Sequence, residues 1–372
     1  MHPTSESKSI TLNLKPAHLG QRIDVVLAQL LPDTSRSKLK IWCEAGAVMQ
    51  ANVVMSANSR IKKVLPLQVT PQADASLAAF TAEDLALDVV FEDAYLAVFN
   101  KPVGMVVHPG AGNWTGTLMN GLLHRYPESH SLPRAGIVHR LDRDTSGLMV
   151  VAKTSATYNA LVAALKARTV QRRYVALVHG VPVWLTTRVN EPIGRDPKLR
   201  VRMAVVHGTA ARPSTGKTAT TDARVLASHA GAGVSLVECK LHTGRTHQIR
   251  VHMAYVKHSL VGDATYGGKP LLGMTRQALH AWQLSFEHPI TGEWISNQSA
   301  PPADMLAALD EINAPWKALS TALAQAPDFE VDAPVLDAIN KDAFDFGSES
   351  DDDFDEDDDF DDSGVEIIYV RD

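Results

Sequence analysis

One stretch of this chain joins two apolar runs to a cluster of charges, and it constrains the fold strongly. Residues 136–138 and 148–153 are apolar or β-branched, which predicts buried strands, and residues 140–144 between them carry two arginines and two aspartates. Burying charge is costly unless the charge is paired. A charged loop between two core strands therefore indicates either a structural ion-pair network at a tight turn or a functional site. These residues alone leave both interpretations open.

Charge is divided unevenly along the 372 residues, which suffice for two folded domains. The net charge of −6 averages two opposite regions. Asp328 to Asp372 hold 19 acidic and 2 basic residues, which leaves 23 acidic and 34 basic residues in 1–327. A folded part this basic predicts a polyanionic partner, and the acidic end predicts a disordered tail.

Several protein classes are excluded by what the sequence lacks. Cys43 and Cys239 lie far apart, which excludes a disulfide framework and a cysteine zinc site and favours a reducing compartment. No apolar stretch is long enough to span a bilayer, and residues 1–8 lack the apolar core of a signal peptide. We expect a cytoplasmic protein without membrane association.

The order of the expected elements predicts an α+β fold on a mixed or antiparallel sheet, because strands follow one another without regular crossover helices. We expect a small α+β module at 10–70, a linker at 71–85, a large domain at 86–325 and a disordered acidic tail at 326–372. Within the large domain we expect a hairpin at 87–102, helices at 117–125 and 155–168, strands at 172–179, 219–226, 234–241 and 278–286, a helix capped by Thr246, and a helical region at 303–322.

Three motifs with catalytic associations lack the context that their chemistry needs. Residues 211–218 satisfy a relaxed phosphate-loop pattern, but a predicted strand follows them where a helix is required. Residues 144–147 resemble half of an aspartic protease site, and no second copy exists. His247 and His252 are not spaced as zinc ligands of a metalloprotease helix.

The small module resembles the S4 RNA-binding domain, which has a basic helix pair followed by a short hairpin. The second expected helix carries a basic cluster of Arg36, Lys38 and Lys40. The resemblance implies that this cluster contacts RNA, although a charge cluster on a helix is commonly a solvated face. Residues 48–52 lack the Asn-Gly turn usual in that family, which leaves the register of the hairpin open.

The large domain resembles the RluA-type pseudouridine synthases. The resemblance rests on Val138 to Gly147, Arg173 to Ala176, Gly244 to His252 and Gly262 to Gly268, and it is strongest to a branch that acts on large-subunit ribosomal RNA. It implies an isomerase that cleaves the N1–C1′ bond of a uridine and rejoins the base through C5, without a cofactor or a metal. The acidic tail is not part of the shared pattern.

Matching positions imply roles for individual residues. Asp142 matches the nucleophile, Arg250 its ion-pair partner, and Tyr174 the residue that stacks on the base and helps to move the C5 proton. Arg140 matches the residue that fills the gap left by the extruded uridine, and Ile249 packs beside the base or in the core. A basic segment with Arg195, Lys198 and Arg200 would hold phosphates.

Two other functions stay open at this point: a synthase for transfer RNA or another ribosomal site, and a ribosome-assembly factor that binds RNA without chemistry. The joint presence of Asp142, Tyr174 and Arg250 favours catalysis over binding alone. We expect a monomer whose partners are ribosomal RNA and the pre-ribosomal particle. The tail either competes with RNA for the basic surface or is a solvated segment.

Overall fold

The computed structural model describes residues 9–32, 34, 36–71, 80–110, 113–199, 201–208 and 214–325, without the side chains of residues 37, 38, 41, 324 and 325. The predicted acidic tail and residues 72–79 of the predicted linker lie outside these ranges.

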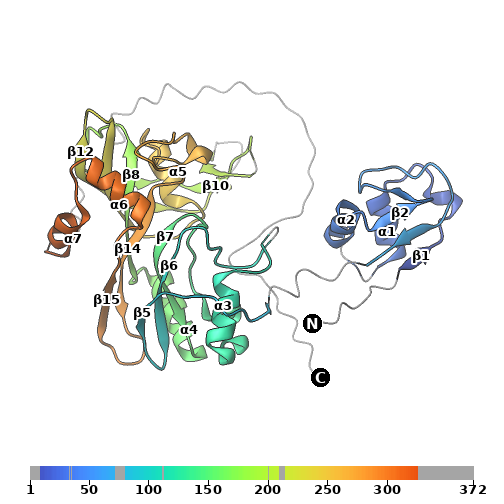
Figure 1. Cartoon of the computed structure of the whole chain (residues 1–372), viewed down its shortest axis with the longest axis horizontal. Helices are drawn as coiled ribbons and strands as arrows, with labels where there is room; N and C mark the ends of the chain where they lie inside the picture. The colour runs from blue at the N-terminus through green and yellow to red at the C-terminus, as the bar shows by residue number, and fades with distance from the viewer. Residues whose placement is uncertain are drawn as a thin grey trace. The chain divides into compact units, whose positions relative to one another are not determined.

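The N-terminal module joins two helices and a four-stranded antiparallel sheet of order β1-β4-β2-β3 around one apolar core (Figure 1). Its elements are β1 (Ile10–Leu12), α1 (Ile23–Leu30), α2 (Arg36–Glu44), β2 (Val48–Gln50), β3 (Val53–Val54) and β4 (Leu67–Val69). Core residues come from both helices and from the strands, among them Ile23, Leu39 and Leu67. The small α+β module and its antiparallel sheet are therefore confirmed.

The β2–β3 hairpin keeps a two-residue turn without glycine. Gln50 pairs with Val53, and the two residues between them, Ala51 and Asn52, have φ angles of 49° and 64°. Two-residue hairpin turns of the primed type require positive φ at both central positions. The register is therefore fixed by Ala51 and Asn52 adopting the conformation that Asn-Gly would adopt more readily.

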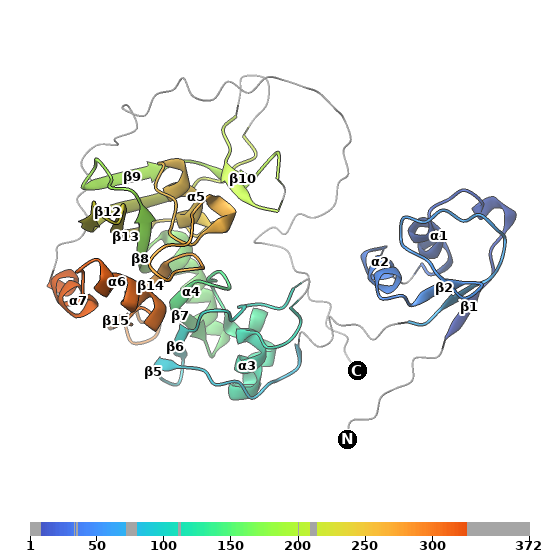
Figure 2. The same cartoon turned by 45° about the horizontal axis from the view of Figure 1, so that its top comes forward.

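The large domain is built on a nine-stranded sheet of order β5-β6-β7-β14-β8-β13-β12-β9, with β15 paired to β14 (Figures 1 and 2). A separate hairpin, β10–β11, lies in the part of the chain between β9 and β12. The strands are β5 (Val89–Glu92), β6 (Leu96–Lys101), β7 (Ser146–Ala152), β8 (Gln171–His179), β9 (Thr186–Asn190), β10 (Ile193–Arg195), β11 (Met203–Val205), β12 (Thr220–His229), β13 (Val234–Leu241), β14 (Leu279–Glu287) and β15 (Trp294–Gln298).

The helices of this domain are α3 (Leu118–Arg125), α4 (Ser155–Ala167), α5 (Gln248–Tyr255), α6 (Ala303–Glu311) and α7 (Trp316–Gln325). Helices α4 and α6 pack in two separate apolar cores with the sheet, and Val251 of α5 packs in a third cluster with Ile193 and Ala219. Leu161 of α4 packs in one core with residues of β6, β7 and β14, and Leu309 of α6 packs in the other with Trp282 and residues of β8 and β13. Figure 2 shows α5 close to the end of the domain that carries β9, β12 and the β10–β11 hairpin.

One parallel junction makes the sheet mixed. Ser146 and Gly147 of β7 pair in parallel with His280 and Ala281 of β14, whereas the other strand pairs of this sheet are antiparallel. The α+β fold with a mixed sheet is thus confirmed. The junction matters because the charged loop at 140–145 ends where β7 begins, and β14 separates β7 from β8.

The strand predicted at 136–138 is wrong. A 3-10 turn, Pro133–Gly136, occupies this part of the chain, and Ile137 forms a single bridge with Val151. Arg134 and Ala135 have φ angles of 51° and 52°, and such consecutive left-handed residues turn the chain before a strand can extend. Gly136 and Ile137 are buried as expected and Val138 is partly buried, but these residues form no strand ladder.

The predicted linker is already part of the large domain at its C-terminal end. The Glu83 backbone N–H donates to the carbonyl of Asn120 at 3.0 Å, and the Glu83 carboxylate accepts from the Gly116 backbone N–H at 3.0 Å. These contacts attach the chain to the start of α3. Ordered packing therefore begins before residue 86, where the sequence predicted the domain to start.

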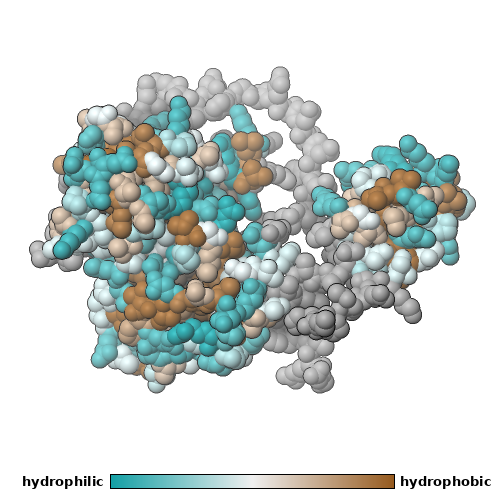
Figure 3. All heavy atoms as spheres, in the orientation of Figure 1, coloured by the Kyte–Doolittle hydropathy of each residue, from teal (hydrophilic) through white to brown (hydrophobic). Residues whose placement is uncertain are grey.

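Within the described ranges, no helix is both long and apolar enough to cross a membrane. Hydrophilic residues cover most of the face drawn in Figure 3, with hydrophobic residues in separate patches.

Gly147 allows the close approach of β7 and β14. Its φ is +114°, and a Cβ at this position would lie 2.3 Å from the carbonyl oxygen of Ala281. Gly104 has a comparable φ of +83°, but no atom lies within 4 Å of the place that a Cβ would occupy. A substitution at Gly104 would therefore introduce backbone strain alone, whereas a substitution at Gly147 would introduce both strain and a steric clash.

We predict that Gly147→Ala lowers the free energy of unfolding by about 3–5 kcal/mol, since strain and displacement of β14 add together. Gly104→Ala should cost about 1–2 kcal/mol through strain alone. Urea unfolding of both variants measures this difference. Equal losses for the two variants would show that the β7–β14 approach is not sterically constrained.

Candidate active site

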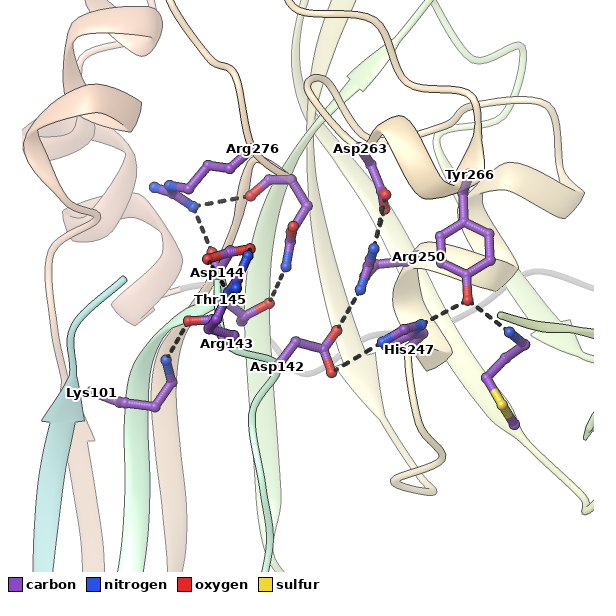
Figure 4. A network of polar contacts seen from close by, with 12 residues as sticks. Lys101, Asp142, Arg143, Asp144, Thr145, His247, Arg250, Asp263, Tyr266 and Arg276 are labelled. Atoms are coloured by element: carbon purple, nitrogen blue, oxygen red, sulfur yellow. Dashed lines mark hydrogen bonds and ion pairs between the residues drawn. The ribbon is translucent and has the colours of Figure 1, made fainter. Parts of the chain in front are cut away.

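Asp142 lies in a loop whose backbone is held at three successive carbonyls. The Asp142 carbonyl accepts from the Thr145 N–H at 3.1 Å, and the Arg143 carbonyl accepts from the Gly104 N–H at 2.9 Å. The Asp144 carbonyl accepts from Nη1 of Arg276 at 3.0 Å. These bonds come from three different segments, so the loop is fixed by the tertiary structure (Figure 4).

Lys101, at the end of β6, is a buried anchor for the same loop. Its Nζ donates to the carbonyls of Pro102 at 2.8 Å, Met105 at 2.9 Å and Arg143 at 2.9 Å. Burial lowers the pKa of Lys101 to about 8, and the charges of Asp142 and Asp144 oppose that shift. The three carbonyl acceptors match the three hydrogens of an ammonium group. Lys101 is therefore charged at neutral pH when it holds the loop.

Arg250 on α5 joins the Asp142 carboxylate to a second carboxylate. Its Nη1 lies 3.0 Å from Oδ2 of Asp142, and its Nε and Nη2 donate to the two oxygens of Asp263 at 2.7 and 2.9 Å (Figure 4). The side chain of Asp263 is 1% exposed and that of Asp142 is 16% exposed. The Asp263 end is therefore a buried anchor, and the Asp142 end is open to a substrate.

The electrostatic balance keeps Arg250 charged. Burial lowers the pKa of Arg250, but hydrogen bonds with Asp263 and the charges of Asp142 and Asp263 outweigh burial and raise this pKa overall. The Tyr266 ring lies below the guanidinium, with its centroid 5.0 Å from Cζ, and adds a cation–π contact. Arg250 therefore places a permanent positive charge beside the Asp142 carboxylate, a group that can act as a nucleophile or a base.

His247 faces the second oxygen of Asp142. Its Nε2 lies 3.9 Å from Oδ1 of Asp142, and its Nδ1 lies 2.7 Å from the Tyr266 hydroxyl. That hydroxyl also accepts from the Met203 N–H at 3.1 Å, which favours donation of its own hydrogen to Nδ1 and leaves the imidazole proton on Nε2. Burial lowers the pKa of His247, while the charges of Asp142 and Asp263 oppose this. His247 is thus neutral at neutral pH and points its N–H toward Asp142.

Tyr174, on β8, is the third residue expected at the centre of the site. It is 5% exposed, and its hydroxyl forms no hydrogen bond with the part of the chain that the structure describes. Burial raises the pKa of Tyr174 to about 12; the Arg172 charge opposes this shift and the Asp142 charge adds to it. The hydroxyl therefore stays protonated at neutral pH.

The other predicted residues are distributed over several surfaces. Ile249 is 3% exposed on α5, and Arg140 is exposed beside the Asp142 loop. In the N-terminal module, Arg36 donates to Asp24 at 3.0 Å, and Lys40 lies 3.9 Å from Glu44. Arg195 and Lys198 are exposed at and after the end of β10. Arg200 and the side chain of Lys38 lie outside the described residues.

Sequence reasoning missed Asp263, Lys101, His247 and Tyr266 as members of the site. Asp263 and Tyr266 fall in the loop 262–268, whose lone carboxylate between glycine and small residues was an available signal. The predicted cap Thr246 is wrong: α5 begins after His247, whose φ of 56° places it in the left-handed region. This conformation occurs at the start of the helix that carries Arg250.

One of the motifs with catalytic associations also lacks its required helix in the structure. Residues after the phosphate-loop pattern form β12, which agrees with its rejection. No group of three His, Cys, Asp or Glu side chains within the described ranges is arranged to hold a metal ion.

We predict that Arg250→Leu lowers the free energy of unfolding by about 3–5 kcal/mol, because it leaves two carboxylates near each other without their cation. Arg143→Leu is the matched control, since Arg143 is 61% exposed and pairs with Asp144 at the surface. Its loss should be under about 1 kcal/mol. Chemical unfolding measures both, and an Arg250→Leu protein as stable as the control would refute the buried bridge.

Comparison with known proteins places this geometry in a family. The model described as RNA pseudouridylate synthase matches residues 95–255. The chain is 43% identical over 363 residues to "Ribosomal large subunit pseudouridine synthase D" of Neisseria meningitidis serogroup A, with 95% of this chain and 90% of that protein covered. It is 43% identical over 317 residues to the protein of the same name from Vibrio parahaemolyticus, covering 82% and 94%.

A solved structure agrees with the sequence comparisons. The structure titled "Human RNA Pseudouridylate Synthase Domain Containing 1" superposes with a TM-score of 0.50 at 28% identity, covering 67% of this chain and 99% of that one. The matched segment 95–255 contains Asp142, Tyr174 and Arg250. The chain therefore belongs to the RNA pseudouridylate synthase family, whose members isomerise uridine in RNA to pseudouridine.

Proposed function

We propose that this protein isomerises uridines of large-subunit ribosomal RNA, with Asp142 as the nucleophile. The observation that carries the proposal is the partly exposed Asp142 carboxylate, held by Arg250, which is itself held by the buried Asp263. The substrate is supported by the relatives, which carry the name of large-subunit synthase D. The basic balance of residues 1–327 agrees with an RNA partner.

The reaction needs the groups that surround Asp142. The Asp142 carboxylate attacks the uridine as the N1–C1′ bond is cleaved. The base then turns and bonds to the sugar through C5, and the bond between Asp142 and the substrate breaks, which regenerates the free carboxylate. The proton lost from C5 balances the proton gained at N1, so the product is an isomer. Arg250 holds the Asp142 carboxylate in place for the attack through their ion pair, and Lys101 holds the backbone of the loop.

Tyr174 acts chiefly by packing against the base. Because burial raises its pKa to about 12, a phenolate that could remove the C5 proton is scarce at neutral pH. The protonated hydroxyl can donate a hydrogen bond or relay a proton to another acceptor. Ile249 would line the same space, and the exposed Arg140 would fill the gap in the RNA left by the extruded uridine.

Regions away from Asp142 would position the RNA. We infer that the N-terminal module, approximately residues 10–70, is an S4-like RNA-binding domain that uses Arg36, Lys38 and Lys40, and that Arg195, Lys198 and Arg200 contact phosphates. The exposed positions of Arg36, Lys40, Arg195 and Lys198 support this inference. We further infer a cytoplasmic monomer that acts on ribosomal RNA or on a pre-ribosomal particle.

We predict that Asp142→Asn lowers the single-turnover rate of pseudouridine formation at least about 1,000-fold while RNA affinity changes less than about threefold, because the substitution keeps shape and removes the nucleophile. Asp144→Asn is the matched control, since the Asp144 side chain pairs with Arg143 near the surface. It should retain most of the rate.

Pseudouridine mapping of large-subunit RNA from a deletion strain, complemented with each variant, is the measurement. Full restoration of modification by Asp142→Asn would refute the catalytic assignment. Growth rescue by that variant without modification would instead favour the assembly-factor function.

A further inference from the structure

Arg172, the second residue of β8, is buried without a partner. It is 8% exposed, and its side chain forms no hydrogen bond or ion pair with any residue that the structure describes. Its Nε is fully enclosed and unsatisfied. The next residue, Arg173, is buried to a similar degree but pairs with Glu238 at 3.2 Å. The contrast between these neighbours shows that the fold supplies a counter-charge for one arginine and omits it for the other.

An unpartnered buried guanidinium is costly, because it loses water without gaining an acceptor. Burial lowers the pKa of Arg172, which is the expected consequence of that cost. A ligand with anionic oxygens would remove the cost by supplying the missing acceptors. The free protein therefore contains a positive charge that a ligand can pair.

The position of Arg172 links it to the Asp142 site. Arg172 and Tyr174 are two residues apart on one strand, so their side chains emerge on the same face. The charges of Arg172 and Asp142 both act on the Tyr174 hydroxyl. Gly244, in the loop before α5, lies against the guanidinium: a Cβ there would be 2.7 Å from Nη1 of Arg172. The absence of a side chain at 244 thus leaves room for this group.

A second donor without a partner lies near Arg172. Nε2 of His139 accepts from the Val150 N–H at 3.2 Å, so the proton of the neutral ring is on Nδ1. That Nδ1 is buried and has no acceptor within the described ranges. Burial and, secondarily, the Arg172 charge lower the pKa of His139 to about 3, which keeps the ring neutral. One cationic donor and one neutral donor therefore lack acceptors in the same neighbourhood.

We propose that Arg172 binds a backbone phosphate next to the uridine whose base enters the Asp142 site. The base is neutral, so phosphate is the substrate group whose charge complements Arg172, and its oxygens fit the two-pronged guanidinium. The contact places the sugar of the uridine relative to Asp142. The positive charge of Arg172 also offsets the net negative charge of the group formed by Asp142, Asp263 and Arg250. This inference rests on the proposed function, because it takes an RNA uridine as the group that reaches Asp142.

The test combines Arg172→Gln with RNA hairpins that the wild-type enzyme converts, each carrying one neutral methylphosphonate near the target. For the wild type, one replacement should weaken binding or slow single-turnover conversion about tenfold or more. For Arg172→Gln, the same replacement should change either quantity less than about twofold, because the contact is already absent. Arg172→Lys should restore part of the loss, since it keeps the charge but not the fork.

Two further variants separate binding from folding. Gly244→Ala should reproduce part of the Arg172→Gln defect, because the new Cβ displaces the guanidinium. Lys166→Gln, on the exposed end of α4, is the control for loss of one positive charge and should leave both quantities unchanged. Thermal unfolding of Arg172→Gln without RNA should occur at or above the wild-type temperature, since an unpaired buried charge has been removed.

The result that would overturn the proposal is an Arg172→Gln protein that keeps wild-type sensitivity to every phosphate replacement. A lower unfolding temperature with unchanged RNA binding would also overturn it, by showing a structural role. Failure of the proposed function looks different: wild-type enzyme would leave large-subunit RNA unmodified, or Asp142→Asn would stay active, whatever Arg172 does.

Discussion

The pairing of Arg250 with Asp142 and Asp263 is the interaction on which this site depends. Three buried or partly buried charges are stable together because one guanidinium satisfies oxygens of both carboxylates at 2.7–3.0 Å. Removing any member leaves a charge without compensation in a poorly solvated place. The two carboxylates also differ in exposure, because Asp263 is fully enclosed and Asp142 remains accessible. Burial therefore leaves only one of these two carboxylates, that of Asp142, open to a substrate.

The sheet brings these groups together from distant parts of the chain. Asp142 precedes β7, Tyr174 lies on β8, and Arg250 follows β13 on α5, while β14 inserts between β7 and β8. The close β7–β14 approach at Gly147 and the carbonyl anchors from Lys101 and Arg276 fix the loop against this framework. Positional accuracy at Asp142 thus comes from backbone contacts that tolerate little movement.

Sequence patterns located most elements because local periodicity sets them, as for α4 and β13. The Asp142–Arg250 contact was expected from family resemblance, and the structure contains it. Asp263, Lys101 and Arg172 were missed as members or neighbours of the site because each contacts a residue that is distant in sequence. Asp263 contacts Arg250 across 13 residues, Lys101 contacts Arg143 across 42, and Arg172 lies against Gly244. No local pattern encodes such contacts. Residues 136–138 were assigned to a strand because burial and β-branching do not reveal left-handed residues at 134 and 135.

The most direct measurement of the central claim is the single-turnover rate of Asp263→Asn, a variant that leaves the carboxylate of Asp142, the proposed nucleophile, untouched. If Asp263 acts by holding Arg250 against Asp142, the rate should fall about tenfold or more while RNA affinity changes less than about threefold. A wild-type rate in this variant would contradict the claim that the buried carboxylate positions the ion pair at Asp142.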